Sequence, residues 1–506
     1  MKKTVFIIMI LTLIAQIIGF ARDLTLAYFY GTSSTSDVYL IALTITSVFF
    51  FLIGTGIATG YIPLLTNIIQ NINSREGLRF TNKLINLLLI ICTIVLVFGI
   101  IFTELIINVV APGFDQNILS MAILFTRISF ISIYFNILTH IFRGFLQVKE
   151  SFFISTIIGI PFSIVLIVSI AVSYHSDVIV LAIGYVFATF IQFLMLLLHA
   201  YRKGYRYEII LDFKDKNIRR IILIAIPVII GTSVNQINLI VNKSIASTVS
   251  VGGISALEYA NTLSNFVLAV VVASIYTVLL PLLSKKAANS DIAGLKEILS
   301  DVIIGMMVLV IPAISGFMIL SEQIVTMLYG RGAFDNEAIF MTANALFYYS
   351  IGLIGYALRD VVSSVFYSLQ DSKIPMINAV IAVALNIILS LMLSKYMGIS
   401  GLALATSLSI IFCTALLIAS LKRKIGSLDF KNIVASFMKI MLASAIMGVI
   451  VKVSFMILSL YITFVLSLLI SIAVGALAYF IFIYLMNIKE VNTIVNGFKV
   501  RLFAKQ

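Results

Sequence analysis

A chain of 506 residues with 61% hydrophobic and only 11% charged residues is too apolar for a soluble globular protein, in which roughly a quarter of the residues are charged. The two cysteines, Cys92 and Cys413, both lie inside apolar runs, so neither a disulfide framework nor a cysteine metal site is indicated. The composition therefore predicts an all-α polytopic membrane protein.

Fourteen apolar runs follow one another along the chain, each long enough to cross a bilayer as a helix of about 20 residues. The first seven occupy residues 4–28, 36–65, 84–110, 118–140, 153–174, 178–200 and 219–242. The second seven occupy residues 258–283, 300–328, 338–368, 375–396, 399–421, 432–457 and 460–487. The connections between them are too short for a folded soluble domain.

Basic residues concentrate on alternate connections and at both ends of the chain, as cytoplasmic segments do in membrane proteins. The side predicted to be external holds only a few of them, namely Lys243, Arg331, Lys395 and Lys452. Both termini are therefore expected in the cytoplasm. This asymmetry, together with the attraction of basic residues to anionic lipid headgroups, explains the net charge of +13. We therefore expect membrane lipids and no nucleic acid among the partners.

An internal repeat relates the first six spans to the next six. Leu146-Gln147-Val148-Lys149 resembles Leu369-Gln370-Asp371-Ser372-Lys373, and Pro63-Leu64-Leu65-Thr66 resembles Pro281-Leu282-Leu283-Ser284, at nearly equal offsets. The repeat predicts a lobe of six helices over 1–216, a second over 217–424, and two extra helices with a tail over 425–506. Parallel repeats of this kind are typical of transporters with a substrate site between the halves.

The chain lacks the motifs that bind nucleotides, since no phosphate-binding loop is present and the glycines near Gly56 have no strand before them. We interpret Gly56 and Gly60 as a small-residue packing face. A transporter without a cofactor, rather than an enzyme, is expected.

Ionisable residues inside the spans are the main candidates for function, because each costs at least ~2.5–3.5 kcal/mol at the bilayer centre. Arg22 and Asp23 lie in the first span. Consecutive helical residues point about 100° apart, so we expect that they do not neutralise each other and that a polar cavity solvates both. Pairing of Arg22 with another helix is the alternative.

Other charged residues permit less definite interpretations. For Arg127 in the fourth span and the Arg359-Asp360 doublet in the tenth, structural pairing and a functional role stay equally open. Four residues near the outer ends of spans are expected to be exposed to water: Asp37, Glu104, Lys243 and Glu258.

Several motifs spread over the whole chain resemble those of the MurJ (MviN) lipid II flippases in the MOP superfamily, which includes MATE-like transporters. They are Gly19-Phe20-Ala21-Arg22-Asp23, Ser36-Asp37-Val38-Tyr39-Leu40-Ile41-Ala42, Glu258-Tyr259-Ala260-Asn261, Phe366 to Pro375, and Gly401 to Ser407. The resemblance implies two six-helix lobes around a cationic cavity and two further helices that form a groove for a polyprenyl tail. It also implies alternating access that moves lipid II across a bacterial plasma membrane for peptidoglycan synthesis.

The candidate substrate-binding residues for a lipid-linked anionic precursor are Arg22 and Asp23, which lie in a family motif, together with the charged residues Asp37, Arg127 and Arg359. The resemblance also implies a site for a coupling sodium ion, formed by Asn242, Asn386, Ser390, the Leu402 carbonyl and Thr406.

Departures from the family pattern leave other functions open. Three cavity charges of the family are replaced, by Gln16, by the run Phe49 to Phe51 and by Thr262, and two sodium carboxylates are replaced by Asn242 and Ser390. An exporter of another polyprenyl-diphosphate oligosaccharide is the main alternative. A multidrug antiporter would need carboxylates in its cavity to bind cations, whereas Arg22 is a cation itself. A membrane glycosyltransferase would need a catalytic acid or base in a large soluble loop, and the loops here are too short for one.

Overall fold

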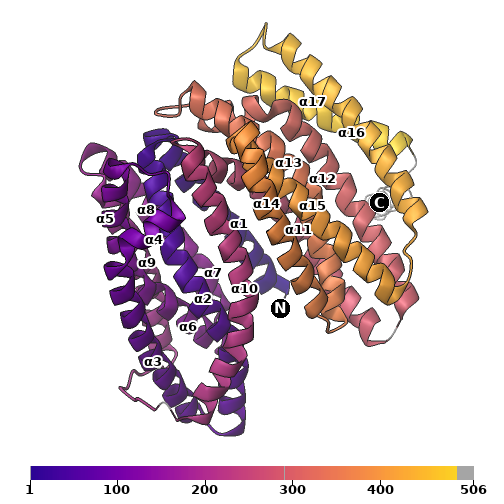
Figure 1. Cartoon of the computed structure of the whole chain (residues 1–506). Helices are drawn as coiled ribbons and strands as arrows, with labels where there is room; N and C mark the ends of the chain where they lie inside the picture. Colours follow the sequence, from indigo (N-terminus) through magenta and orange to yellow (C-terminus); the bar gives the residue numbers. More distant parts are fainter. Residues whose placement is uncertain (1, 213, 290, 487–506) are drawn as a thin grey trace. The chain divides into compact units, whose positions relative to one another are not determined.

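The computed structural model describes residues 2–486 except 213 and 290, and in this part of the chain it contains seventeen α-helices and no strand. Thirteen helical segments of the described chain are long and apolar enough to cross a membrane. The predicted run at 258–283 coincides with a further helix, α11 (Gly253–Ala288). The all-helical polytopic fold is confirmed (Figure 1).

The helices form two compact units. The first comprises Met1–Ser255 together with Arg331–Asp335. Its helices are α1 (Lys2–Tyr30), α2 (Ser34–Asn71), α3 (Ser74–Ile101), α4 (Thr103–Val110), α5 (Gln116–Phe130), α6 (Ser132–Val148), α7 (Phe152–Ile157), α8 (Gly159–His175), α9 (Ile179–Arg202) and α10 (Lys216–Val249). Helix α2 is central, because it packs against α3, α5, α6 and α10.

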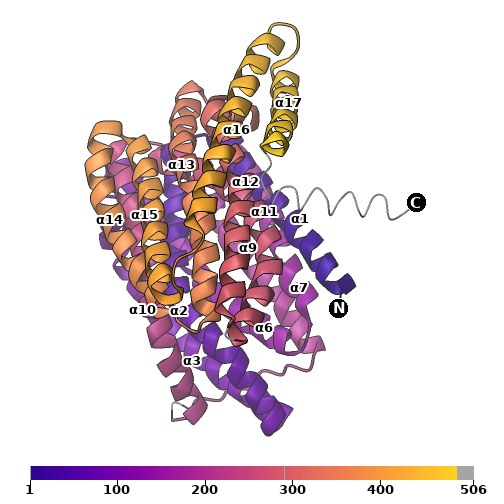
Figure 2. The same ribbon diagram turned by 90° about the vertical axis from the view of Figure 1, so that its right-hand side faces the viewer.

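The second unit comprises Ala256–Gly330 and Asn336–Gln506. It contains α11 after its first residues, followed by α12 (Ile292–Tyr329), α13 (Asn336–Ser368), α14 (Lys373–Met397), α15 (Ile399–Ile425), α16 (Phe430–Leu458) and α17 (Phe464–Leu485). Helix α13 packs between α12 and α15, and α14 packs on α15. The last two helices lie side by side, with α16 against α12 (yellow in Figures 1 and 2).

The units do not follow the division of the sequence repeat. Helix α10 comes after residue 216, where the repeat places the second lobe, but it packs against α2, α3 and α4 within the first unit. Its contact with α2 includes the predicted glycine face, because a Cβ on Gly56 would lie 2.8 Å from Ile229 and 3.0 Å from the Ala225 carbonyl oxygen. The packing interpretation of Gly56 and Gly60 is confirmed.

Short polar residues mark where several helices begin. The side chains of Asn73, Asp115 and Asp429 accept hydrogen bonds from backbone N–H groups three residues later, at 2.8, 2.9 and 3.2 Å. Such caps satisfy donors that the first helical turn leaves without partners. They place the helix starts in the polar connections that the sequence predicts.

The connection between α9 and α10 is docked on α3. The Asn82 amide donates to the Arg206 carbonyl oxygen at 2.9 Å, and Lys83 forms ion pairs with Asp212 and Asp215 at 2.9 and 2.7 Å. Burial raises the pKa of Asp215, but the charge and hydrogen bond of Lys83 together with hydrogen bonds from the Asn217 and Ile218 N–H groups outweigh burial, so the pKa lies below its usual range. This basic-rich connection therefore has a defined position.

Two short turns are held at the other end of the first unit. The backbone N–H of Ala333, in the turn between α12 and α13, donates to the Tyr28 carbonyl oxygen at 2.8 Å. Gly31 has a φ of +56°, and a Cβ there would lie only 2.3 Å from the Ala333 carbonyl oxygen. Glycine is thus required at Gly31 for both its conformation and this close approach.

Candidate functional site

Arg22 and Asp23 on α1 form an ion pair, which corrects the expectation that neighbouring helical residues cannot neutralise each other. The Arg22 guanidinium donates to Asp23 Oδ1 from Nε at 2.8 Å and from Nη2 at 2.6 Å. The prediction considered only the direction of the Cα–Cβ bonds, whereas the long arginine side chain folds back along the helix. Both side chains keep access to their surroundings, with exposed fractions of 31% and 21%.

The ion pair lies beside further polar groups of the first unit. Tyr39 on α2 is 3% exposed and lies within electrostatic range of Arg22, Asp23 and Tyr185. Its hydroxyl has no hydrogen-bond partner in the described chain. Asn136 on α6 is 3.5 Å from the Tyr185 hydroxyl of α9. Four helices, α1, α2, α6 and α9, therefore contribute to one polar interior.

Sequence reasoning missed Arg143, which lies on α6, the helix that carries Asn136. The fourth span was predicted to end at residue 140, but α6 continues to Val148, so Arg143 lies within a helical segment that is apolar and long enough to cross a membrane. Its Nε is buried and has no hydrogen bond to any described residue. Four polar residues at helical spacing, Asn136, His140, Arg143 and Gln147, would have indicated this face of the helix.

His140 brings the same face close to a position where the family carries a positive charge. Its ring centroid lies 4.6 Å from that of Phe50 on α2. Phe50 is in the aromatic run that replaces the expected basic residue of the second span. Arg143 follows His140 by three residues on α6 and therefore lies on the same face of that helix.

The other predicted arginines are not gathered around Arg22 within the first unit. Arg127 lies in that unit, but it is exposed on α5. Arg359, on α13 of the second unit, pairs with its neighbour Asp360 at 2.8 Å, and its guanidinium lies 5.4 Å from the Tyr356 ring centroid. Structural pairing is thus present at Arg359, and no pairing with a described residue is seen at Arg127.

Asp37 is buried, so the expectation that it is exposed was wrong. Its side chain is 1% exposed and accepts three hydrogen bonds of 2.8 Å, from the Gly252 N–H and from the N–H and hydroxyl of Ser255. The sequence did not reveal this because the acceptor and the donors are more than 200 residues apart. Asp37 joins the start of α2 to the turn between α10 and α11.

Glu104 and Lys243, which were also expected to be exposed to water, differ in their exposure. Glu104 is exposed, as predicted. Lys243 on α10 is only half-exposed, and its ammonium donates to the Thr44 hydroxyl of α2 at 2.7 Å. Asp37 and Lys243 therefore both contribute to the packing of unit 1, through α2.

Four of the five predicted sodium ligands lie on two packed helices of the second unit. Asn386 and Ser390 are buried on α14, while Leu402 and Thr406 lie on α15. The Asn386 amide donates to the Thr406 hydroxyl at 3.3 Å, and that hydroxyl donates to the Leu402 carbonyl oxygen at 2.9 Å. Asn386 Oδ1 is buried with no hydrogen bond in the described residues. The fifth residue, Asn242, belongs to the first unit.

Comparison with known proteins agrees with this architecture. The family profile described as "Lipid II flippase MurJ" matches residues 26–491. A "Probable lipid II flippase MurJ" of Buchnera aphidicola subsp. Baizongia pistaciae is 29% identical over 80% of both chains. The protein of the same name from Treponema pallidum is 28% identical over 83% of this chain and 82% of its own.

Solved structures give the same result. A lipid II flippase MurJ in an inward closed conformation superposes with a TM-score of 0.82 at 26% identity, covering 94% of this chain and 98% of that chain. An inward-facing MATE family transporter of the MOP superfamily has a TM-score of 0.70 at 12% identity and covers 82% and 96%, a likeness of fold alone. With a family profile matched from residue 26 to residue 491, the chain belongs to the lipid II flippase MurJ family.

Proposed function

We propose that this protein moves lipid II from the inner to the outer leaflet of the bacterial plasma membrane by alternating access, as a transporter and not as an enzyme. The observation that carries the proposal is the family match over residues 26–491. The two relatives above bear the name "Probable lipid II flippase MurJ", which favours lipid II over another polyprenyl-diphosphate oligosaccharide.

Arg22 and Arg143 are the residues that we propose to contact the diphosphate of the substrate. Arg22 is partly exposed, and Arg143 has no carboxylate partner among the described residues. Guanidinium groups give planar, multidentate hydrogen bonds to phosphate oxygens. Arg143 compensates for the aromatic run on α2, so the loss of a cation there does not require a different substrate. Asp23 tunes Arg22 by competing with phosphate for its guanidinium.

The other three candidate substrate-binding residues have secondary roles in this proposal. Arg127 and Arg359 attract the anionic substrate as it approaches, and Asp37 holds α2 in the position that binding requires. Asn386, Ser390, Thr406 and the Leu402 carbonyl, all of the second unit, would hold a sodium ion, whose binding would couple transport to the sodium gradient. The buried and unpartnered Asn386 Oδ1 supports this assignment, because neutral oxygens are ligands that hard cations accept. Replacement of sodium by choline should then slow transport.

The orientation that we propose has both termini in the cytoplasm. The native cysteines are buried, so introduced cysteines can be read against a low background. Asn117→Cys, exposed at the start of α5, should react with an impermeant thiol reagent in intact cells. Glu208→Cys, exposed between α9 and α10, should react only after permeabilisation. The opposite pattern would refute the orientation.

The decisive experiment replaces the lipid II flippase of a bacterial cell by this protein and measures lipid II on the outer leaflet. Expression should restore exposure of lipid II and growth. Arg22→Ala should abolish this restoration while the amount of folded protein stays unchanged. Arg79→Ala, which removes an exposed arginine paired with Glu76 at 3.0 Å, is the matched control and should restore like the native chain. No restoration by correctly inserted native protein would overturn the function.

A further inference from the structure

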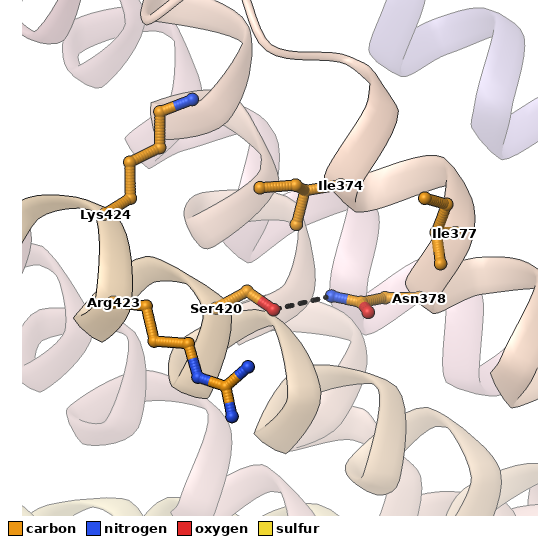
Figure 3. Close-up of a pocket in the computed structure, with 6 residues that line it drawn as sticks. All are labelled: Ile374, Ile377, Asn378, Ser420, Arg423 and Lys424. Carbon is orange, nitrogen blue, oxygen red and sulfur yellow. Dashed lines mark hydrogen bonds between the residues drawn. The ribbon is translucent and has the colours of Figure 1, made fainter.

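A pocket of about 510 Å³ lies at one end of the α14–α15 hairpin. It is lined by Ile374, Ile377 and Asn378 of α14 and by Ser420, Arg423 and Lys424 of α15 (Figure 3). None of these residues belongs to the substrate or sodium sites proposed above. The pocket has an apolar wall from one helix and a basic wall from the other.

The floor of the pocket is polar, and a hydrogen bond holds its side chains in place. Asn378 is 6% exposed, and its amide donates to the Ser420 hydroxyl at 3.3 Å (Figure 3). Buried amides and hydroxyls of this kind hold a fixed geometry because an unpaired polar group would be costly. They provide hydrogen-bonding groups beside the two cations at the mouth.

The two cations of the pocket differ in their availability. Lys424 forms an ion pair with Asp371 and lies 5.9 Å from the Phe366 ring centroid. Arg423 is exposed, extends in a different direction from Lys424, and makes no ion pair with a described residue (Figure 3). Arg423 is therefore available to an anion, whereas Lys424 is shared with Asp371.

The apolar wall continues along the outer face of α14. Ile377, Val380, Ile381, Ile388 and Leu391 are each more than 40% exposed and recur at helical spacing. In a membrane protein such a stripe faces lipid. A ligand that fits this arrangement has an anionic group at the end of the hairpin and hydrocarbon chains along the helix.

We propose that this pocket binds an anionic phospholipid, with the phosphate on Arg423 and the acyl chains along the exposed stripe of α14. Basic pockets between membrane helices on the cytoplasmic side bind such headgroups. The positive charges of Arg423 and Lys424 favour an anionic lipid over a zwitterionic one. The lipid would brace the hairpin that also carries Asn386 and Thr406.

Asp371 gives the proposal a prediction of opposite sign. The ion pair with Lys424 holds the pKa of Asp371 below its usual range, so this carboxylate stays ionised and competes with phosphate for the ammonium. Asp371→Asn keeps a side-chain oxygen at the start of α14 but releases Lys424. Lipid binding should therefore become tighter in this variant, and weaker in Arg423→Ala.

The test uses the purified full chain and native mass spectrometry with phosphatidylglycerol and phosphatidylcholine. The native protein should retain phosphatidylglycerol preferentially, Arg423→Ala should lose about fivefold in affinity, and Asp371→Asn should gain. Arg202→Ala removes an exposed arginine from the last turn of α9, outside the pocket, and should change nothing.

Two results would overturn the proposal. One is equal loss of phosphatidylglycerol in Arg423→Ala and Arg202→Ala. The other is displacement of the lipid by millimolar inorganic phosphate, which would identify a soluble anion as the ligand. Melting temperatures of all variants separate loss of binding from loss of folding, and Asp371→Asn cannot bind more tightly through misfolding.

Discussion

The buried carboxylate of Asp37 allows a quantitative test of how unit 1 is held together. Asp37→Ala would leave two backbone donors, the N–H groups of Gly252 and Ser255, without their acceptor, and the Asp37 site is only 1% exposed. The Ser255 hydroxyl would keep the Gly252 carbonyl oxygen, to which it also donates at 3.0 Å. Each buried donor left unpaired costs about 1–3 kcal/mol, so we expect a loss of about 2–6 kcal/mol in the free energy of unfolding.

Asp37→Asn should cost less than Asp37→Ala. Its carbonyl oxygen can keep the bonds from Ser255, but its NH₂ group then faces the Gly252 N–H, so about 1–3 kcal/mol is lost. Purified protein with a fluorescent tag is heated in detergent, and the folded fraction is followed by size-exclusion chromatography. At about 2 °C per kcal/mol for a unit of this size, Asp37→Ala should lower the midpoint by about 4–12 °C.

Asp115 provides the matched control, because it is an exposed aspartate that caps α5 with one hydrogen bond of 2.9 Å. Asp115→Asn should shift the midpoint by about 2 °C or less, since asparagine is an equally good cap. If Asp37→Asn melted like the native protein but no longer bound lipid II, Asp37 would be a substrate contact and the reasoning about its three hydrogen bonds would be wrong.

Three further predictions follow from other sites. Arg143→Gln should lower lipid II transport about tenfold at limiting substrate and Arg143→Lys should recover part of it, measured as outer-leaflet lipid II; native-like transport in Arg143→Gln would exclude the phosphate contact. Because its folded pKa is depressed, Asp215 contributes stability that is present above the unfolded pKa of about 3.9 and is lost as the pH falls through the folded pKa. The melting midpoint of the native protein should therefore stay constant from pH 7 to 5 and fall below pH 4. The midpoint of Asp215→Asn should fall less, and an equal fall in both proteins would contradict this. A Cβ on Gly184 would lie 2.2 Å from Ser169 Oγ, whereas one on Gly305 meets nothing within 4 Å, so Gly184→Ala should reduce the yield of folded protein and Gly305→Ala should not; similar yields would show that α8 and α9 can separate.

The positions of the spans were predictable because backbone polar groups in lipid must be hydrogen-bonded within the protein, and an α-helix does this within one segment. The ends were less so, since a charged residue suggests a boundary although its helix can continue past it. The fourth span was predicted to end at residue 140, so Arg143 was absent from the candidate set. A polar stripe at helical spacing was the better signal.

The pairing of charges was harder to predict than their positions. The rule that adjacent helical residues diverge holds for Cβ atoms but not for the end of an arginine, so the Arg22–Asp23 pair was missed, whereas pairing of Arg359 with Asp360 was one of two interpretations left open. The environment of Asp37 depends on Gly252 and Ser255, which a single sequence cannot place beside it. The packing of α10 on α2 depends in the same way on tertiary contacts, which the repeat does not encode.

The turn Arg331–Asp335 has a consequence for measurements of motion. These five residues belong to unit 1, in which the Ala333 N–H donates a hydrogen bond to the Tyr28 carbonyl oxygen. Helices α12 and α13 on either side of the turn belong to unit 2. A spin label or fluorophore on this turn would therefore lie among residues of unit 1, although its sequence neighbours would suggest the other unit. Pairs of labels that are meant to follow one unit against the other should be placed on helices away from this turn.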